Sequence, residues 1–315
     1  MKTGAPPRTV QKSKSFLSLA HRHQFPTIEG FAASQFPSDM TPLFFEHGVY
    51  RTPPQRPSLL ARWFPSLAFY SRYVRIVFRS AGVAKRSLYD DLAWSTSSLE
   101  VMRALERVGV QFEITGVEHL QRLQTPCVVV ANHMSTLETA VLPAVIQPIR
   151  NVTFVVKQAL LHYPIFKYVM RSRNPIAVTT NNAREDFKIM MTEGAERLSR
   201  GISVVVFPEG ARRHTFDPAE FNTIGIKLAQ RAGVPILPLA LVTDAWPLGR
   251  PLSDFGKLEP SRKVRFAFAS PIEVAGRGAD EQQAIIRFIM DKLATWHSED
   301  HPAHGLAALQ TTGIS

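Results

Sequence analysis

The sequence has one cysteine, Cys127, and this scarcity excludes an intramolecular disulfide and any zinc cluster built on cysteines. It also lacks an uncharged apolar run of the roughly 18 residues that a membrane-spanning helix needs. The N-terminus lacks the apolar core of a secretory signal, and no Gly-x-Ser-x-Gly motif supports a serine hydrolase of that type. The chain is therefore expected not to cross a membrane, although it could lie on one.

Acidic residues are scarce in the first part of the chain. The net charge is +11, and residues 1–89 hold 13 Lys and Arg against 3 Asp and Glu, so most of the excess lies there. Residues 1–57 are rich in proline and poor in apolar periodicity, which predicts a disordered basic tail. Because no acid precedes Glu29, this tail loosely resembles an organelle transit peptide. Positive charge on this scale attracts an anionic membrane, nucleic acid or an acidic protein.

Residues 58–108 are predicted to form a pair of helices that associates with a membrane. Within residues 69–79, three arginines (Arg72, Arg75 and Arg79) share one helical face, and aromatic and aliphatic side chains cover most of the remainder. A narrow basic stripe beside a wide apolar face suits the plane of an anionic bilayer. A helix packed on the protein's own core, with its arginines in water, would show the same pattern.

Residues 109–300 alternate short apolar strands with helices. This alternation predicts an α/β fold with a mixed, largely parallel sheet that helices cover on both faces. A capping-box pattern at Ser97-x-x-Glu100 places the second helix of the preceding pair at residues 97–108. Strands are expected at residues 110–115, 127–131, 152–156, 176–179, 203–207, 236–241 and 264–269. Helices are expected at residues 136–146, 183–199, 221–232 and 280–296, and residues 301–315 read as a flexible tail.

The stretch ANHMSTLE, residues 131–138, follows one predicted strand and contains a histidine and a carboxylate five positions apart. In a regular helix such residues are about 140° apart and do not meet. They can meet if His133 precedes the helix and Glu138 lies in its first turn, and Ser135-x-x-Glu138 fits a capping box at that place. A neutral imidazole can take a proton from an alcohol, and a carboxylate on its other nitrogen would fix its tautomer. The alternative is that Glu138 only caps a backbone N–H.

A second motif, FPEGARR at residues 207–213, leaves another predicted strand. Gly210 permits a tight turn whose backbone N–H groups can face an anion, and Arg212 and Arg213 can grip phosphate oxygens. A surface turn with two solvated arginines is the alternative. Further on, GVPILPL at residues 233–239 is an apolar strand bracketed by prolines, which either lines an apolar tunnel or belongs to the core.

Together these motifs resemble the lysophospholipid acyltransferase family, which includes the 1-acylglycerol-3-phosphate acyltransferases. The likeness rests on NHxxxxE at a strand end, followed by FPEGxR and then VPILPL, and it covers roughly residues 58–297. It implies the transfer of a fatty acyl group from acyl-CoA or acyl carrier protein to the hydroxyl of a lysolipid. The alcohol would attack the thioester directly, so the resemblance implies neither a metal nor a cofactor.

The resemblance also implies a role for each motif residue. His133 looks like the general base that deprotonates the acceptor hydroxyl, and Glu138 would orient it. Four residues match positions that hold the acceptor's phosphate: Lys157, Glu209, Gly210 and Arg212. Three match a motif linked to the acyl chain and the donor: Val234, Pro235 and Pro238.

The sequence departs from the family pattern at three places. Glu138 stands where the family usually has Asp, so the spacing to the histidine must adjust. Ala211 and Arg213 replace the usual Thr and Ser. Thr180 stands where the family often has an arginine that touches the phosphate, and Arg184, one helical turn on, is a candidate substitute.

Two other functions fit parts of the sequence. Late acyltransferases of lipid A have a histidine followed five positions later by Glu, but the FPEGAR motif argues against that group. A non-catalytic protein could use the basic N-terminal part to bind a membrane or nucleic acid. No nucleic-acid partner is predicted, because the aromatics lie on the apolar side of the arginine-bearing helix and are not interleaved with the basic residues. The spacing His297-x3-His301-x2-His304 is typical of metal ligands, but it lies in a hydrophilic C-terminal stretch. The predicted location is the cytoplasmic face of a membrane, bound peripherally.

Overall fold

A mixed sheet of eight strands forms the centre of the protein. The computed structural model describes residues 43–250 and 252–301. The strands are β1 (Tyr50–Arg51), β2 (Phe112–Thr115), β3 (Val128–Ala131), β4 (Val152–Lys157), β5 (Ile176–Val178), β6 (Ser203–Val206), β7 (Ile236–Val242) and β8 (Val264–Phe268). Their order in the sheet is β1-β2-β8-β7-β3-β6-β4-β5, and neighbours are parallel except at β1–β2 and β7–β8. The predicted mixed, largely parallel sheet is confirmed.

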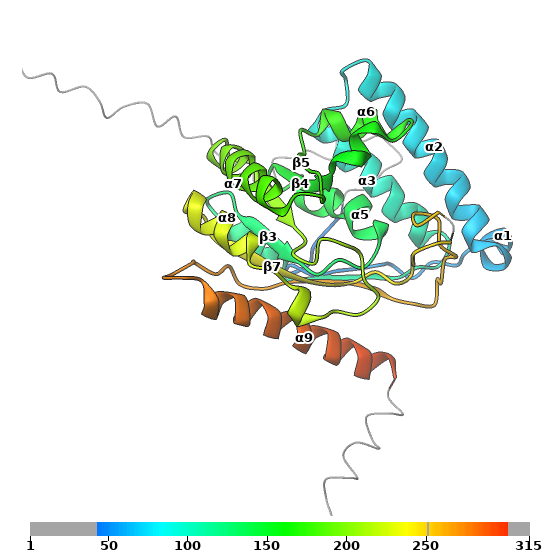
Figure 1. The fold of residues 1–315 in the computed structure, drawn as a ribbon. Helices are drawn as coiled ribbons and strands as arrows, with labels where there is room; N and C mark the ends of the chain where they lie inside the picture. Colours follow the sequence, from blue (N-terminus) through cyan, green and yellow to red (C-terminus); the bar gives the residue numbers. More distant parts are fainter. Residues whose placement is uncertain (1–42, 251, 302–315) are drawn as a thin grey trace, which may run out of the picture.

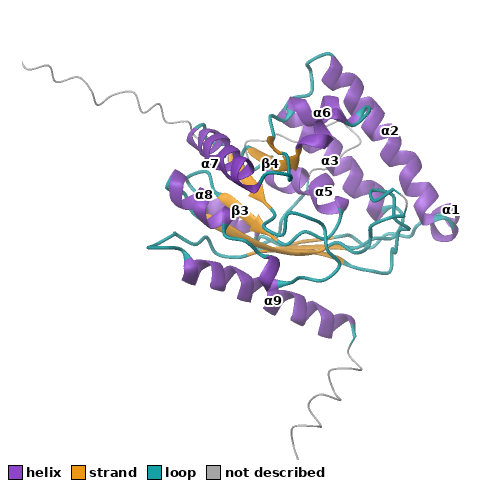
Figure 2. Ribbon diagram, viewed as in Figure 1, coloured by secondary structure: helices purple, strands orange, loops and turns teal. Residues whose placement is uncertain are grey.

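Helices cover both faces of this sheet (Figure 1, Figure 2). They are α1 (Leu59–Trp63), α2 (Pro65–Lys85), α3 (Asp91–Glu106), α4 (Val117–Arg122), α5 (Thr136–Ile146), α6 (Phe166–Ser172), α7 (Ala183–Ser199), α8 (Ile224–Ala232) and α9 (Ala279–Asp300), with 3-10 turns at η3 (Gln158–His162) and η4 (Pro218–Glu220). Side chains of β3 alternate between two hydrophobic clusters. Val129 and Ala131 join the cluster shared with α2, α3 and α5, whereas Val128 and Val130 join the cluster shared with α7, α8 and α9.

Part of the predicted disordered tail has a defined structure. Residues 43–57 include β1, which pairs antiparallel with β2. Tyr50 is buried, and its hydroxyl donates a hydrogen bond of 2.6 Å to the buried Glu106 carboxylate. The tail prediction was therefore wrong for this part, because a strand of two residues has too little periodicity for a sequence pattern to detect. The remainder of the predicted tail, residues 1–42, lies outside the described residues, and so do residues 302–315 of the predicted C-terminal tail.

The second helix of the predicted pair begins earlier than expected. The N-cap of α3 is Asp90, whose side chain accepts from the backbone N–H of Ala93. Ser97 and Glu100 lie inside the helix, so the predicted capping box at this place is wrong. The Ser97 hydroxyl donates instead to the carbonyl of Trp94, three residues earlier in the same helix. A capping-box pattern within a continuous helix marks no boundary.

One apolar stripe of α2 packs on the core. The buried Trp246 contacts three aromatic rings of α2, with ring centroids 4.8 to 6.0 Å away: Phe69, Tyr70 and Tyr73. For these residues the membrane-facing prediction was wrong, and the alternative of a helix packed on its own protein is confirmed. Other apolar side chains of α1 and α2 remain exposed, and we call them the exposed apolar stripe: Leu59, Leu60, Trp63, Phe64, Leu67, Val74 and Phe78. No helix within residues 43–250 and 252–301 combines the length and the hydrophobicity of a membrane span.

The packing of α2 predicts different costs for removing two tryptophans. Trp246→Ala should lower the free energy of unfolding by about 3–5 kcal/mol, because it leaves a cavity in a fully buried aromatic cluster. Trp63→Ala is the matched control, since this side chain is 78% exposed and its loss should change stability by about 0.5 kcal/mol or less. Urea unfolding followed by circular dichroism measures both values. Equal costs for the two substitutions would contradict the described packing.

Candidate active site

The predicted site residues lie at the carboxyl ends of four neighbouring strands. Strands β3, β6, β4 and β5 are adjacent and parallel, so their carboxyl ends lie together. Open α/β sheets bind ligands outside these ends. His133 follows β3, the turn at residues 207–213 follows β6, Lys157 ends β4, and Thr180 follows β5. The topology thus gathers residues that are far apart in the sequence.

His133 and Glu138 are in contact, as the sequence predicted. The Nδ1 atom of His133 lies 2.9 Å from Oε1 of Glu138. Helix α5 begins between them. Its N-cap is Ser135, which completes a capping box with Glu138. Glu138 Oε1 also accepts from the backbone N–H groups of Met134 and Ser135, at 2.6 and 2.8 Å. Glu138 therefore caps the helix and holds the imidazole at the same time.

The carboxylate of Glu138 is fully buried. Its Oε2 atom accepts from the hydroxyls of Ser135 and Thr243, at 3.0 and 2.7 Å. Burial alone would favour the neutral acid, but the hydrogen bonds from His133, Ser135 and Thr243 hold the pKa of the Glu138 carboxyl below its usual value. An anionic carboxylate at Nδ1 selects the tautomer with a proton on Nδ1, which leaves Nε2 able to accept one.

His133 is held from three further directions. Its ring stacks on Phe207, with ring centroids 4.2 Å apart and planes 16° from parallel. Its backbone N–H donates to Glu209 Oε1 at 2.7 Å, and its carbonyl accepts from the backbone N–H of Arg213 at 2.8 Å. The side chain is 17% exposed, and Nε2 has no hydrogen-bonding partner in the part of the chain that the structure describes. The ring is fixed and one nitrogen remains accessible to a substrate.

Glu209 contacts the loop of His133 and is largely buried. Burial raises the pKa of its carboxyl to about 7, although the hydrogen bond from His133 and the charge of Arg213 oppose this shift. The next residue, Gly210, has φ +67°, in the left-handed region that favours glycine, and its N–H donates to the carbonyl of Phe207. The resemblance linked Glu209 to the acceptor's phosphate, whereas its contact in the structure is with the backbone of the loop.

Arg212 lies beside the N-terminus of α5. Its Nη1 atom lies 2.5 Å from Asp254 Oδ1 and donates to the hydroxyl of Thr136, and its Nη2 atom donates to the hydroxyl of Ser253 at 3.1 Å. Both the guanidinium and the adjacent helix N-terminus attract anions. Ser253 and Asp254 were missed in the sequence because no motif or periodicity links them to the FPEGARR turn.

Three other predicted positions lie along the same edge without contacting His133. Lys157 is exposed at the end of β4, and its side chain forms no hydrogen bond or ion pair within residues 43–250 and 252–301. Thr180 has φ +65°, and its N–H donates to the carboxylate of Asp186 at 2.7 Å. Arg184 is exposed in the first turn of α7.

The structure does not bring the GVPILPL motif to the histidine. Val234 and Pro235 precede β7, and the register of β7 against β3 places Pro235 opposite the start of β3. At about 3.3 Å per residue, this lies roughly 20 Å along the strand from His133. Pro238 is buried inside the sheet, opposite Val130. In the structure these three residues belong to the core and its border.

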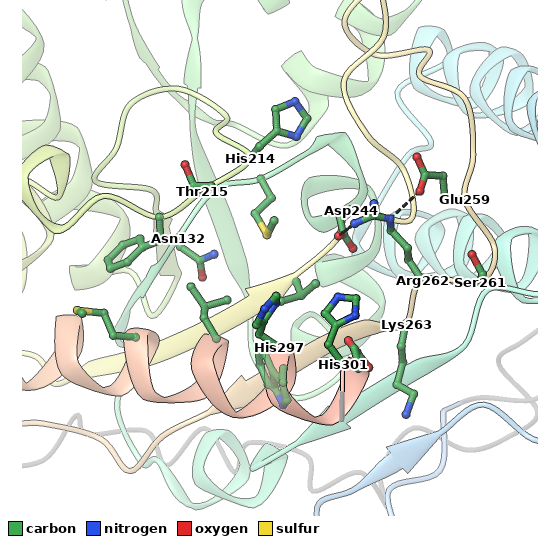
Figure 3. A pocket seen from close by; sticks show the side chains of 17 residues that line it. Asn132, His214, Thr215, Asp244, Glu259, Ser261, Arg262, Lys263, His297 and His301 are labelled. Carbon is green, nitrogen blue, oxygen red and sulfur yellow. Dashed lines mark hydrogen bonds and ion pairs between the residues drawn. The ribbon is translucent and has the colours of Figure 1, made fainter. Parts of the chain in front are cut away.

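A cleft of about 760 Å³ opens on the face of the sheet that α9 covers, opposite the face that carries α5. Figure 3 shows it between residues 214–216 and helix α9, with Asn132 and the ion-paired Arg262 on its wall. Asn132 and Met134, which follow β3, line this cleft, whereas the ring of His133 between them contacts Glu138 of α5. None of the four predicted phosphate-binding residues lines the cleft.

Two of the three histidines with the spacing of metal ligands line this cleft. His297 and His301 line it, with ring centroids 4.8 Å apart. His304 lies outside the described residues. Among the residues that are described, no group of three or more His, Cys, Asp or Glu is arranged to hold a metal ion.

Comparison with known proteins finds similar sequences for residues 111–242. Residues 111–242 match the family model described as Acyltransferase. The chain is 33% identical over 132 residues to the 1-acyl-sn-glycerol-3-phosphate acyltransferase of Pseudomonas aeruginosa, covering 42% of this chain and 49% of that protein. It is 28% identical over 131 residues to the human 1-acyl-sn-glycerol-3-phosphate acyltransferase beta, covering 42% and 46%. The matches span about half the length of these curated relatives.

The fold also has a solved counterpart. The crystal structure of the 1-acyl-sn-glycerophosphate acyltransferase PlsC from Thermotoga maritima aligns with a TM-score of 0.55 and 21% identity, covering 74% of this chain and 95% of that one. The resemblance predicted from the motifs is thus confirmed: residues 111–242 match the Acyltransferase family model, and the relatives that this region matches are named 1-acyl-sn-glycerol-3-phosphate acyltransferases.

The raised pKa of Glu209 predicts a pH-dependent stability. Because the folded pKa of about 7 lies above the ordinary value, the folded protein binds this proton more tightly than the unfolded chain. That contribution is lost as the pH rises through 7. Glu209→Gln keeps an oxygen for His133 but has no such proton, so its unfolding free energy relative to wild type should rise between pH 5 and pH 8 by roughly 1–3 kcal/mol. Urea unfolding at both pH values tests this, and a constant difference would contradict it.

Proposed function

We propose that this protein is an O-acyltransferase. It moves a fatty acyl group from a thioester, acyl-CoA or acyl carrier protein, to the hydroxyl of a lysophospholipid such as 1-acylglycerol-3-phosphate. This proposal rests on the contact of 2.9 Å between His133 Nδ1 and the buried Glu138 carboxylate. The contact lies at the end of a strand, within the residues that match the Acyltransferase family model. The similarity to named 1-acyl-sn-glycerol-3-phosphate acyltransferases supports the substrate class.

The geometry around His133 supports its role as the general base. The acceptor hydroxyl would give its proton to Nε2 while its oxygen attacks the thioester carbonyl. The anionic Glu138 stabilises the imidazolium that forms. The carbon–sulfur bond then breaks, and the departing thiolate takes the proton back from the imidazolium. The reaction balances without an acyl-enzyme.

The charges along the strand edge support an anionic acceptor. Arg212 lies at the N-terminus of α5, the end of a helix that favours negative charge. The exposed Lys157 and Arg184 follow the neighbouring strands β4 and β5 and have no acidic partner within the described residues. We propose that these three cations favour the phosphate of an acceptor whose hydroxyl is bound at His133.

The exposed apolar stripe supports peripheral binding to an anionic membrane, and we place this at the cytoplasmic face. Arg75 is exposed beside the stripe, whereas Arg79 is ion-paired with Glu100. Large apolar side chains exposed on two neighbouring helices mark a contact surface. The single thiol, Cys127, is buried and free, which fits a reducing compartment.

The purified protein should transfer labelled acyl groups to 1-acylglycerol-3-phosphate, and His133→Ala should lower the rate on the order of 10²–10⁴-fold. Wild type and variant would be compared with acyl-CoA and acyl carrier protein as donors, over a panel of lysolipids with and without phosphate. His119→Ala, in α4, is the control and should keep the wild-type rate. No transfer by the folded wild type with any donor and acceptor would contradict the proposed function, and transfer only to phosphate-free acceptors would contradict the substrate class.

Removing apolar residues from the stripe should weaken membrane binding. The double variant Trp63→Ser and Leu67→Ser should bind anionic liposomes about 10-fold to 100-fold more weakly, because two side chains no longer enter the interface. Met290→Ser is the matched control, since Met290 is an exposed apolar residue of α9 on the other face of the sheet. Liposome sedimentation measures the partition of each protein. Equal liposome binding by wild type and both variants would contradict a membrane contact through the stripe.

A further inference from the structure

Arg212 is held by residues from two distant parts of the chain. Asp254 Oδ1 accepts from Arg212 Nη1 at 2.5 Å and from the Thr136 hydroxyl at 2.8 Å. The Ser253 hydroxyl accepts from Arg212 Nη2 at 3.1 Å, and Arg212 Nη1 also donates to Thr136. We call Thr136, Ser253 and Asp254 the arginine clamp. It fixes a long side chain that would otherwise sample many rotamers.

The clamp leaves one edge of the guanidinium available. A guanidinium carries five N–H groups in a planar fork. Nη1 uses two of them and Nη2 uses one, so Nε and the second hydrogen of Nη2 remain. No group among the described residues accepts from these two. Nε and Nη2 point the same way and can bind two oxygens of one phosphate side by side.

The backbone that carries the clamp is anchored to the core and to α2. The indole N–H of the buried Trp246 donates to the carbonyl of Asp254 at 3.1 Å. The hydroxyl of Tyr70 donates to the carbonyl of Gly256 at 2.5 Å, and the N–H of Leu258 donates to the hydroxyl of Ser66 at 3.0 Å. Asp254 is therefore fixed by its surroundings before any ligand arrives.

We infer that Asp254 is a positioning residue for acceptor recognition, which holds Arg212 with its Nε–Nη2 edge turned to the acceptor's phosphate. This inference rests on the proposed function. A carboxylate beside Arg212 also repels a phosphate, so Asp254 as a mere competitor would weaken acceptor binding. Its contacts favour positioning, because the carboxylate occupies the Nη1 side and leaves the other edge of the fork to the ligand.

Steady-state acyl transfer to 1-acylglycerol-3-phosphate tests the inference on the full chain. Asp254→Ala should raise the KM for this acceptor about 10-fold to 100-fold, because a misplaced arginine meets the phosphate poorly. The kcat and the KM for the acyl donor should stay within about twofold of wild type, since the lost contact concerns binding of the acceptor alone. Asp254→Asn keeps an acceptor oxygen for Arg212 and should give an intermediate KM, which also serves if the alanine variant fails to fold.

A double-mutant cycle separates positioning from general support of the structure. In the Arg212→Ala background, Asp254→Ala should cause no further rise in KM, because its effect passes through the arginine. Asp244→Ala is the matched control: this carboxylate lies in the same connection between β7 and β8 and also pairs with an arginine at 2.5 Å, but it faces the cleft of Figure 3. It should leave the acceptor KM unchanged.

Three kinetic results would overturn the inference while the proposed function stands. They are additive effects of the Arg212 and Asp254 substitutions, an acceptor KM that falls in Asp254→Ala, and an equal rise in KM in Asp244→Ala. A wild-type protein that is folded but transfers no acyl group to any acceptor would instead overturn the proposed function, and this inference with it.

Discussion

One buried carboxylate connects the separate pieces of the candidate site. Glu138 accepts five hydrogen bonds: from the imidazole of His133, the backbone N–H groups of Met134 and Ser135, and the hydroxyls of Ser135 and Thr243. These five donors offset the cost of burying a negative charge, so the carboxylate of Glu138 is stable without a proton. The helix cap and the contact with His133 do not exclude each other, because the same oxygen of Glu138 makes both.

The FPEGARR turn supports the same histidine from its other side. Glu209 accepts from the backbone N–H of His133, Arg213 donates to its carbonyl, and Phe207 stacks on its ring. A motif that the resemblance links to phosphate thus also fixes the position of His133. Only Arg212 of this turn directs its side chain to the neighbouring helix N-terminus, where an anion is favoured.

The sequence predicted the sheet well because its buried strands are short runs of β-branched residues separated by clear helical stretches, as at Val128–Ala131 and Ser203–Val206. It could not tell which side of α2 faces inward, since apolar residues occur on both sides and only the partner, Trp246, decides. Within the site, the residues next to strand ends were found because motifs mark them. Asp254 was not found, because its link to Arg212 spans 42 positions and depends on the folded path of an irregular segment.

Helix α2 joins the two proposed surfaces into one unit. Its inner side holds Trp246 and, through Tyr70 and Ser66, the backbone around Asp254. Its exposed side carries Leu67, Val74 and Phe78 of the exposed apolar stripe, and the exposed Leu252 and Phe255 flank the Ser253–Asp254 pair. Phe255 lies against the ring of Tyr70, with centroids 5.2 Å apart, so this segment and the helix form one packed surface. The helix that carries part of the proposed membrane contact and the segment that holds Arg212 therefore depend on one set of aromatic contacts.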